Sequence, residues 1–159
     1  MVGNRLGADP LLDAMAVYKT ELAKGSPSAQ FEQLEKIVKE LPDINRQDKA
    51  GMTYLAVAVR QYKADIVQLL LENGADPNIA DNLGVYPLAC VFLKKVPDTE
   101  KIIRILLEFG ADPSLGKTPK HTPFYYAKVT QADPAWEELL QEATIKLHGI
   151  PFSSTNWMD

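Results

Sequence analysis

The sequence is poor in the residues that most often build catalytic and metal sites. Among 159 residues it has one cysteine, Cys90, and two histidines, His121 and His148. A single cysteine excludes an internal disulfide and a cysteine-cluster metal site, and it suits a reducing compartment. A metal site or a Ser/His/Asp constellation needs several convergent groups, and no spacing in the sequence indicates one. We therefore predict no catalytic, metal-binding or cofactor-binding residues and expect that the protein is not an enzyme.

These few reactive side chains have structural interpretations. Cys90 stands between two apolar residues, which predicts a buried thiol rather than a reactive one. His148 falls near the end of a helical pattern, where a cation is favourable, and no carboxylate pattern links it to His121. His121 belongs to a predicted turn. We interpret acidic pairs such as Glu137 and Glu138 as charges on a helix face.

Long apolar runs and basic clusters are also missing. No run approaches the roughly 18 to 20 apolar residues of a membrane-spanning helix, and the opening MVGNRLGADP lacks a signal-peptide pattern. The formal net charge is -4, and the lysines and arginines are spread along the sequence. Since nucleic-acid binding needs a concentrated basic surface, we expect a cytoplasmic protein that binds neither nucleic acid nor a membrane.

What the sequence does contain is a repeated phrase. ENGADPN at residues 72–78 returns as EFGADPS at residues 108–114. In each copy a helical pattern ends at a glycine, which tolerates the left-handed conformation, and a proline that cannot continue the helix follows. The similarity extends upstream at a spacing of 33 residues (Asp48 to Asp81) and elsewhere at 36 (Ile66 to Ile102). This predicts structural repeats, with a three-residue insertion in the linker LKKVPDTEK.

Residues 48–80 carry a resemblance to one known family. DKAGMTYLAVAVRQYKADIVQLLLENGADPNIA resembles an ankyrin repeat, with the D-x-x-G-x-T-P-L-H-x-A-A opening and the L-L-x-x-G-A-D-x-N close of that family. The resemblance implies an all-α repeat fold: an ankyrin-repeat solenoid of stacked helix-turn-helix units with short hairpin fingers. The sequence departs from the family pattern at Ala56, which replaces the histidine of the opening, and at Tyr62, which replaces the glycine that ends the first helix.

We expect a single repeat domain over residues 10–148, because terminal repeats are atypical but still stack on their neighbours. The predicted parts are a flexible N-terminus 1–9, an N-terminal helical cap 10–47, the repeat 48–80, the repeat 81–116 with the insertion, a C-terminal cap repeat 117–148 and a tail 149–159.

Four prolines mark predicted helix starts in the two caps. Asp9-Pro10 predicts a helix over residues 10–24, Ser26-Pro27 a helix over 28–41, and Asp133-Pro134 the last helix. In the C-terminal cap, Thr122 can also cap a first helix, with Pro123 in its first turn. In the tail, Phe152 and Trp157 either fold back on the last helix or belong to a mobile segment.

The resemblance implies a protein-binding module whose concave face combines the finger tips with the exposed side of the first helices. Exposed apolar side chains at finger tips serve as interface anchors, although they could instead pack on each other and stiffen the fingers. The insertion around Pro97 is a second candidate site, with a neutral insertion as the alternative. The predicted protein-binding residues are Lys49, Ala50, Met52, Arg60, Gln61, Asn82, Leu83, Val85, Leu93 and Lys94.

A small acidic protein of this kind can act by occupying a partner. We therefore expect a monomeric inhibitor or adaptor that binds another protein. The alternatives are an immunity protein that neutralises a bacterial toxin, a regulator similar to the small ankyrin kinase inhibitors, a structural scaffold, and a small enzyme on an unfamiliar cap.

Overall fold

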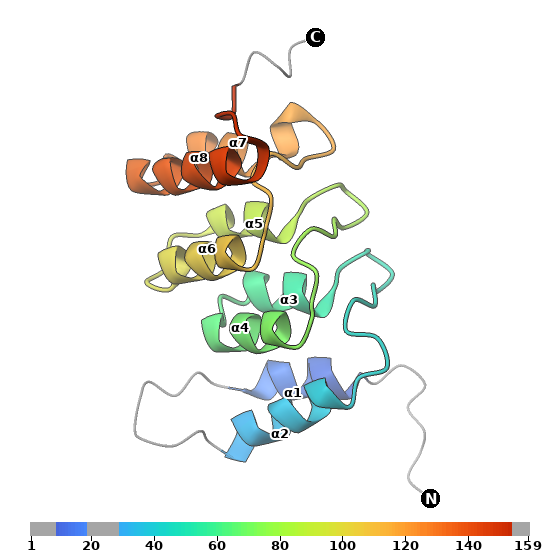
Figure 1. The fold of residues 1–159 in the computed structure, drawn as a ribbon. Helices are drawn as coiled ribbons and strands as arrows, with labels where there is room; N and C mark the ends of the chain where they lie inside the picture. Colours follow the sequence, from blue (N-terminus) through green and yellow to red (C-terminus); the bar gives the residue numbers. More distant parts are fainter. Residues whose placement is uncertain (1–8, 19–28, 154–159) are drawn as a thin grey trace, which may run out of the picture.

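The computed structural model describes residues 9–18 and 29–153, and the helices in this part of the chain stack in pairs (Figure 1). The described residues contain no β-strand, only an isolated bridge between Gln47 and Thr53. The elements are α1 (Pro10–Val17), α2 (Ala29–Lys39), α3 (Tyr54–Arg60), α4 (Ala64–Glu72), α5 (Pro87–Cys90), η1 (Val91–Leu93), α6 (Thr99–Glu108), η2 (Pro119–His121), α7 (Pro123–Val129) and α8 (Pro134–His148).

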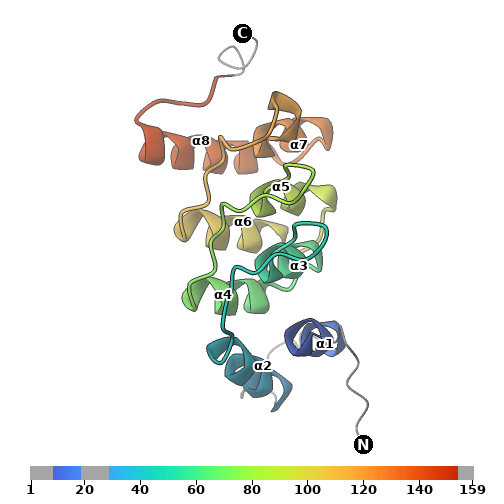
Figure 2. The same ribbon diagram turned by 90° about the vertical axis from the view of Figure 1, so that its right-hand side faces the viewer.

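Four layers follow one another, each made of a first helix (α1, α3, α5 or α7) and a second helix (α2, α4, α6 or α8). Figure 2 shows the first helices on one side of the stack and the second helices on the other. Hairpin loops project from one end of the layers, and the connections between α3 and α4, α5 and α6, and α7 and α8 lie at the opposite end (Figure 1). The predicted all-α fold of stacked helix-turn-helix units with short fingers is confirmed. No helix among the described residues is long and apolar enough to span a bilayer.

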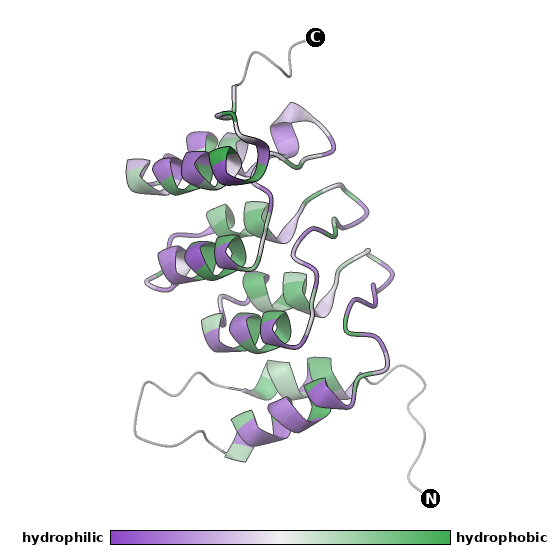
Figure 3. Cartoon of the chain, in the orientation of Figure 1, coloured by the Kyte–Doolittle hydropathy of each residue, from purple (hydrophilic) through white to green (hydrophobic). Residues whose placement is uncertain are grey.

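The core runs through the stack because each layer buries an apolar stripe against the next. Leu55, Ile66, Leu70, Ile102 and Leu106 are completely buried. Figure 3 shows that hydrophobic residues dominate α3 and α5, whereas α2 and α8 carry more polar residues. The contrast follows the order of the helices within a layer, since α1 of the first layer is mostly apolar (PLLDAMAV) whereas the internal α6 (TEKIIRILLE) carries several charged residues.

Two glycines end the second helices as the repeated phrase predicts. Gly74 and Gly110 have positive φ angles of 95° and 87°. After each glycine, the next backbone N–H bonds back to the helix, from Ala75 to Leu70 O at 3.0 Å and from Ala111 to Leu106 O at 2.9 Å. A Cβ added at either glycine would meet no atom within 4 Å, so conformation and not space requires glycine here.

The first helix is shorter than the sequence predicts. Asp9 caps α1 by accepting hydrogen bonds from the N–H groups of Leu11 and Leu12, at 3.0 and 3.2 Å. The helix ends at Val17 rather than at residue 24, so this boundary was wrong. The reason is tertiary: the extended Tyr18 donates its hydroxyl hydrogen bond to Asp65 of α4. Residues 19–28, including Ser26-Pro27, lie outside the described residues, and α2 is described from Ala29.

The insertion forms an ordered loop at the end of the stack opposite the hairpins. The buried Thr99 holds it, accepting a hydrogen bond from Val96 N at 3.0 Å and donating one to Lys94 O at 3.4 Å. Tyr62, which replaces the consensus glycine, takes a left-handed φ of 54° and donates to Val91 O at 3.2 Å. The side chain at this turn therefore ties the second layer to the third.

The C-terminal layer keeps the predicted helix starts. Thr122 caps α7 and Asp133 caps α8, by accepting from backbone N–H groups at 3.2 and 3.0 Å. The beginning of the tail folds back: the ring of Phe152 stacks on Phe124 with centroids 4.1 Å apart. The Phe152 N–H also donates to Gln141 Oε1 at 2.9 Å. Trp157 lies outside the described residues.

Candidate functional site

Three fingers project from the stack, and we define them as residues 47–52, 80–85 and 115–121. The first finger is a tight turn held by Asp48, whose carboxylate accepts the N–H groups of Ala50 and Met52 at 2.8 and 2.9 Å. Asp81 makes the equivalent bonds in the second finger at 2.9 and 3.0 Å. Because both turns hold themselves together, little entropy remains to be lost when a partner binds.

Hydrogen bonds also join the first finger to the second. The side chain of Asn82 donates to Lys49 O at 2.8 Å, and its backbone N–H donates to Ala50 O at 2.9 Å. Gln47 bridges the fingers from its side-chain nitrogen, to Gly51 O at 2.7 Å and Ala80 O at 3.0 Å. The two fingers therefore form one continuous surface.

Close packing at two glycines brings all three fingers together. A Cβ on Gly51 would lie 2.4 Å from Asn82 Oδ1, and a Cβ on Gly84 would lie 2.3 Å from the Cβ of Lys117 in the third finger. Such distances are shorter than any van der Waals contact. Both glycines also have positive φ angles, of 76° and 82°. These positions exclude larger residues for two reasons, conformation and space.

The predicted binding residues divide into groups in the structure. Leu83 is 72% exposed at the tip of the second finger, whereas Met52 and Val85 are half-buried. Val85 packs against the hydrophobic core. The Met52 sulfur accepts a long hydrogen bond from Arg60 at 3.6 Å, which draws this arginine toward the first finger. Leu83 is thus the apolar residue that stands free at the fingers.

The other predicted residues are polar tips or lie farther from the fingers. The exposed finger residues are Lys49, Ala50 and Asn82. Gln61, Leu93 and Lys94 are also exposed, but they follow α3 or belong to the end of η1 and the insertion. These connections lie opposite the fingers in Figure 1. A single compact interface therefore fits the finger residues and Arg60 better than it fits all ten predicted binding residues.

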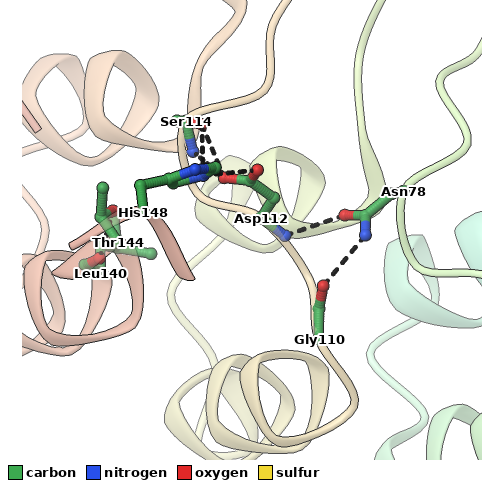
Figure 4. Close-up of polar contacts among 7 residues, drawn as sticks. All are labelled: Asn78, Gly110, Asp112, Ser114, Leu140, Thr144 and His148. Atoms are coloured by element: carbon green, nitrogen blue, oxygen red, sulfur yellow. Dashed lines mark hydrogen bonds and ion pairs between the residues drawn. The ribbon is translucent and has the colours of Figure 1, made fainter. Parts of the chain in front are cut away.

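A second series of contacts runs along the turns that follow the second helices. Asn45 Oδ1 accepts the N–H of Asp76 at 2.8 Å. One layer later, Asn78 Oδ1 accepts the N–H of Asp112 at 2.8 Å, while its side-chain nitrogen donates to Gly110 O at 3.0 Å (Figure 4). Asn45 and Asn78 therefore each fasten their layer to the next one.

The last of these contacts has a different chemistry, which sequence reasoning missed. His148 Nε2 lies 2.8 Å from Asp112 Oδ2 and 3.3 Å from Ser114 Oγ (Figure 4). The Ser114 hydroxyl itself donates to Asp112 Oδ1 at 2.7 Å. His148 does lie in the last turn of α8, as predicted, but its contact with a carboxylate of the neighbouring layer was not foreseen. Its spacing of 34 residues from Ser114, close to one repeat, was the signal available.

This Asp112–Ser114–His148 cluster does not have the geometry of a proton relay. In a Ser/His/Asp triad the carboxylate and the hydroxyl bind opposite nitrogens of the imidazole. Here both contact Nε2. The cluster instead joins the end of α8 to the turn after α6, as the asparagines do in the earlier layers.

A hollow borders the first finger at its N-terminal side. It has a volume of about 480 Å³ and lies among α1, the end of α2 and Tyr54. The Tyr54 hydroxyl donates to Asp9 Oδ2 at 2.6 Å, and Arg46 lies 3.5 Å from the same oxygen. Burial, followed by the bond to Asp9, raises the pKa of Tyr54. The side chains of Asp9, Arg46 and Tyr54 are thus already paired with one another.

Metal chemistry and thiol chemistry find no support in the described part of the chain. No group of three or more His, Cys, Asp or Glu side chains converges there. Cys90 is buried, as predicted, and burial raises the pKa of its thiol to about 11. The thiol is therefore protonated and unreactive at neutral pH.

The geometry defines a class of fold, a solenoid of helix-turn-helix repeats with finger-like hairpins, and comparisons with known proteins identify the repeat. A family model for ankyrin repeats (many copies) matches residues 38–89. Ankyrin repeat protein 14 of Vaccinia virus (strain Western Reserve) is 54% identical over 44 residues, which cover 28% of this chain and 19% of the viral protein. Regulatory protein SWI6 of Kluyveromyces lactis is 47% identical over 45 residues, covering 28% of this chain and 6% of that protein. The match thus spans less than a fifth of either relative.

A solved structure shares the fold over most of the chain. The crystal structure of an ankyrin repeat domain from Acinetobacter baumannii AYE superposes with a TM-score of 0.69, covering 86% of this chain and 64% of that chain at 24% identity. Residues 38–89 are therefore similar to ankyrin repeats, and the described residues have the fold of an ankyrin repeat domain. Ankyrin repeats are generally non-catalytic modules for protein–protein interaction.

Proposed function

We propose that this protein is a non-catalytic binding module that occupies a partner protein through its fingers and first helices, as an inhibitor or adaptor. The observation that carries the proposal is Leu83, a large apolar side chain that is 72% exposed on a finger with a fixed backbone. Interfaces draw most of their binding energy from a few such anchors, provided that they lie on a preorganised surface.

The proposed contact has a centre and a border. Leu83 forms the centre, and the exposed Lys49, Ala50 and Asn82 surround it on the joined fingers. Arg60 borders this area because its guanidinium reaches Met52. An apolar centre with a polar border is the usual composition of a protein interface.

The proposal extends to the state and location of the protein. We propose that it acts as a monomer in the cytoplasm, and that its partner is a protein. A single reduced cysteine is consistent with a reducing compartment.

The test compares two single variants, each of which replaces one exposed apolar residue with aspartate. Partners are captured on the immobilised wild-type chain from a lysate of the source organism, identified by mass spectrometry and purified. Leu83→Asp should weaken binding of the purified partner at least about tenfold, because it removes the anchor and leaves the fold unchanged. The matched control, Ile145→Asp on α8, also alters an exposed apolar residue, which is 47% exposed, and should bind as wild type.

Circular dichroism checks that both variants are folded. If Leu83→Asp binds as wild type and Ile145→Asp does not, the contact surface lies on α8 and the proposed face is wrong. The partner's own activity, measured with and without the wild-type chain, then separates an inhibitor, which lowers it, from an adaptor, which leaves it unchanged.

A further inference from the structure

The glutamates of this acidic protein gather on one set of helices. Every glutamate among the described residues lies on a second helix or directly after one, so the fingers and the first helices that the structure describes carry none. These glutamates are Glu32, Glu35, Glu40, Glu72, Glu100, Glu108, Glu137, Glu138 and Glu142.

The fingers carry exposed cations instead. Lys49 lies on the first finger, and Lys117 and Lys120 lie on the third. None of the three forms an ion pair with any residue that the structure describes. The carboxylates of Asp48 and Asp81 each accept two backbone N–H bonds within their own turns. The three fingers therefore carry three lysines against two aspartates, a formal charge of +1 in a chain whose net charge is -4.

The lysines flank the exposed leucine. The carbonyl group of Lys49 accepts the hydrogen bond from Asn82, the residue before Leu83. On the other side, Gly84 packs against the side chain of Lys117. Leu83 therefore stands on the middle finger, between two fingers that carry exposed lysines. In sequence these residues are far apart, and only the stacking of the repeats brings them together.

We propose that the partner contributes an acidic segment to this contact, with an apolar side chain that packs on Leu83 and with carboxylates that reach Lys49 on one side and Lys117 and Lys120 on the other. This inference rests on the proposed function and specifies the chemistry of the partner. Exposed ion pairs add little affinity each. Charge complementarity instead accelerates association and selects among partners, within a Debye length of about 10 Å at 0.1 M salt.

The same observations favour a protein over a nucleic acid. The three fingers contain no Phe, Tyr or Trp on which a base could stack. The formal net charge of -4 repels a polyanion at long range. A short acidic segment with an apolar residue meets neither difficulty, because it contacts only the fingers.

The experiment compares peptides selected by the wild-type chain with those selected by two charge variants. The finger variant is Lys49→Glu/Lys117→Glu/Lys120→Glu. The matched control, Lys36→Glu/Lys101→Glu/Lys146→Glu, reverses three exposed lysines on α2, α6 and α8 and changes the net charge equally. Each chain selects from a display library of short random peptides, and the dissociation constants of synthetic peptides are then measured by fluorescence anisotropy.

We expect the wild type and the control to select peptides rich in Asp and Glu around an apolar residue. The finger variant should bind these peptides at least about tenfold more weakly, and their wild-type affinity should fall with added salt. Selected peptides that are not acidic but lose affinity with Leu83→Asp would overturn the acidic partner and leave the proposed function standing.

Other outcomes would contradict the proposed function itself or the protein nature of the partner. Peptides that bind the finger variant and Leu83→Asp as tightly as wild type, or a selection that enriches no peptide, would contradict the proposed function as well. A fluorescein-labelled DNA duplex that binds more tightly than the acidic peptides, and only when Lys49, Lys117 and Lys120 are intact, would overturn the inference in favour of nucleic acid.

Discussion

Two glycine-to-alanine substitutions measure how strongly the fingers hold each other. Gly74 and Gly51 both have positive φ angles, of 95° and 76°. Alanine costs about 1–2 kcal/mol in this region of backbone conformation. At Gly74 this is the whole effect, because an added Cβ meets nothing within 4 Å. At Gly51 the Cβ would lie 2.6 Å from the backbone nitrogen of Asn82, so the second finger must also move.

That movement breaks two hydrogen bonds, from Asn82 to the carbonyl groups of Lys49 and Ala50. At about 0.5–1.5 kcal/mol each, they bring the expected loss for Gly51→Ala to about 2–5 kcal/mol. Urea unfolding followed by circular dichroism gives the free energy of unfolding of both variants. If Gly51→Ala is no less stable than Gly74→Ala, the fingers are not coupled through this contact and the argument for a rigid surface fails.

Three further predictions concern other contacts. Asn78→Ala should lower the free energy of unfolding by about 1–3 kcal/mol, because the N–H of Asp112 loses its acceptor; the same urea titration measures it, and an unchanged midpoint would refute the contact between layers. Cys90 should not react with a thiol reagent at neutral pH until the protein unfolds. Burial raises the pKa of this thiol from 9.0 to about 11, so its contribution to stability is complete below pH 9.0 and is lost as the pH rises toward 11. Urea unfolding measured across this pH range detects the loss. Labelling of Cys90 before the protein unfolds would contradict the prediction. His148→Ala should cost about 0.2–1 kcal/mol and speed amide exchange at the end of α8, whereas unchanged exchange there would show that the bond to Asp112 does not hold the helix.

The local features of the fold could be predicted from the sequence because their causes are local. Gly74 and Gly110 adopt the left-handed conformation that the repeated phrase requires. Asp9, Thr122 and Asp133 cap the helices that they were expected to begin. The capping hydrogen bonds close within three residues and the bonds after the glycines within five, so a short stretch of sequence contains all the necessary information.

The features that failed depend on partners far away in the sequence. The end of α1 is set by Tyr18 and Asp65, which are 47 residues apart. The contact of His148 with Asp112 spans 36 residues and crosses from one layer to the next. The burial of Val85 likewise depends on how the fingers meet the core. Repeat spacing indicates which residues become neighbours, but it does not give their distances or their burial.

The central claim is that the fingers are the surface that holds a partner. Hydrogen–deuterium exchange on the chain, alone and with the purified captured partner, tests it most directly. We predict that the partner slows exchange of the backbone N–H groups in residues 47–52 and 80–85 and leaves the second helices unchanged. Protection confined to α4, α6 and α8, with the fingers exchanging as in the free chain, would contradict the account.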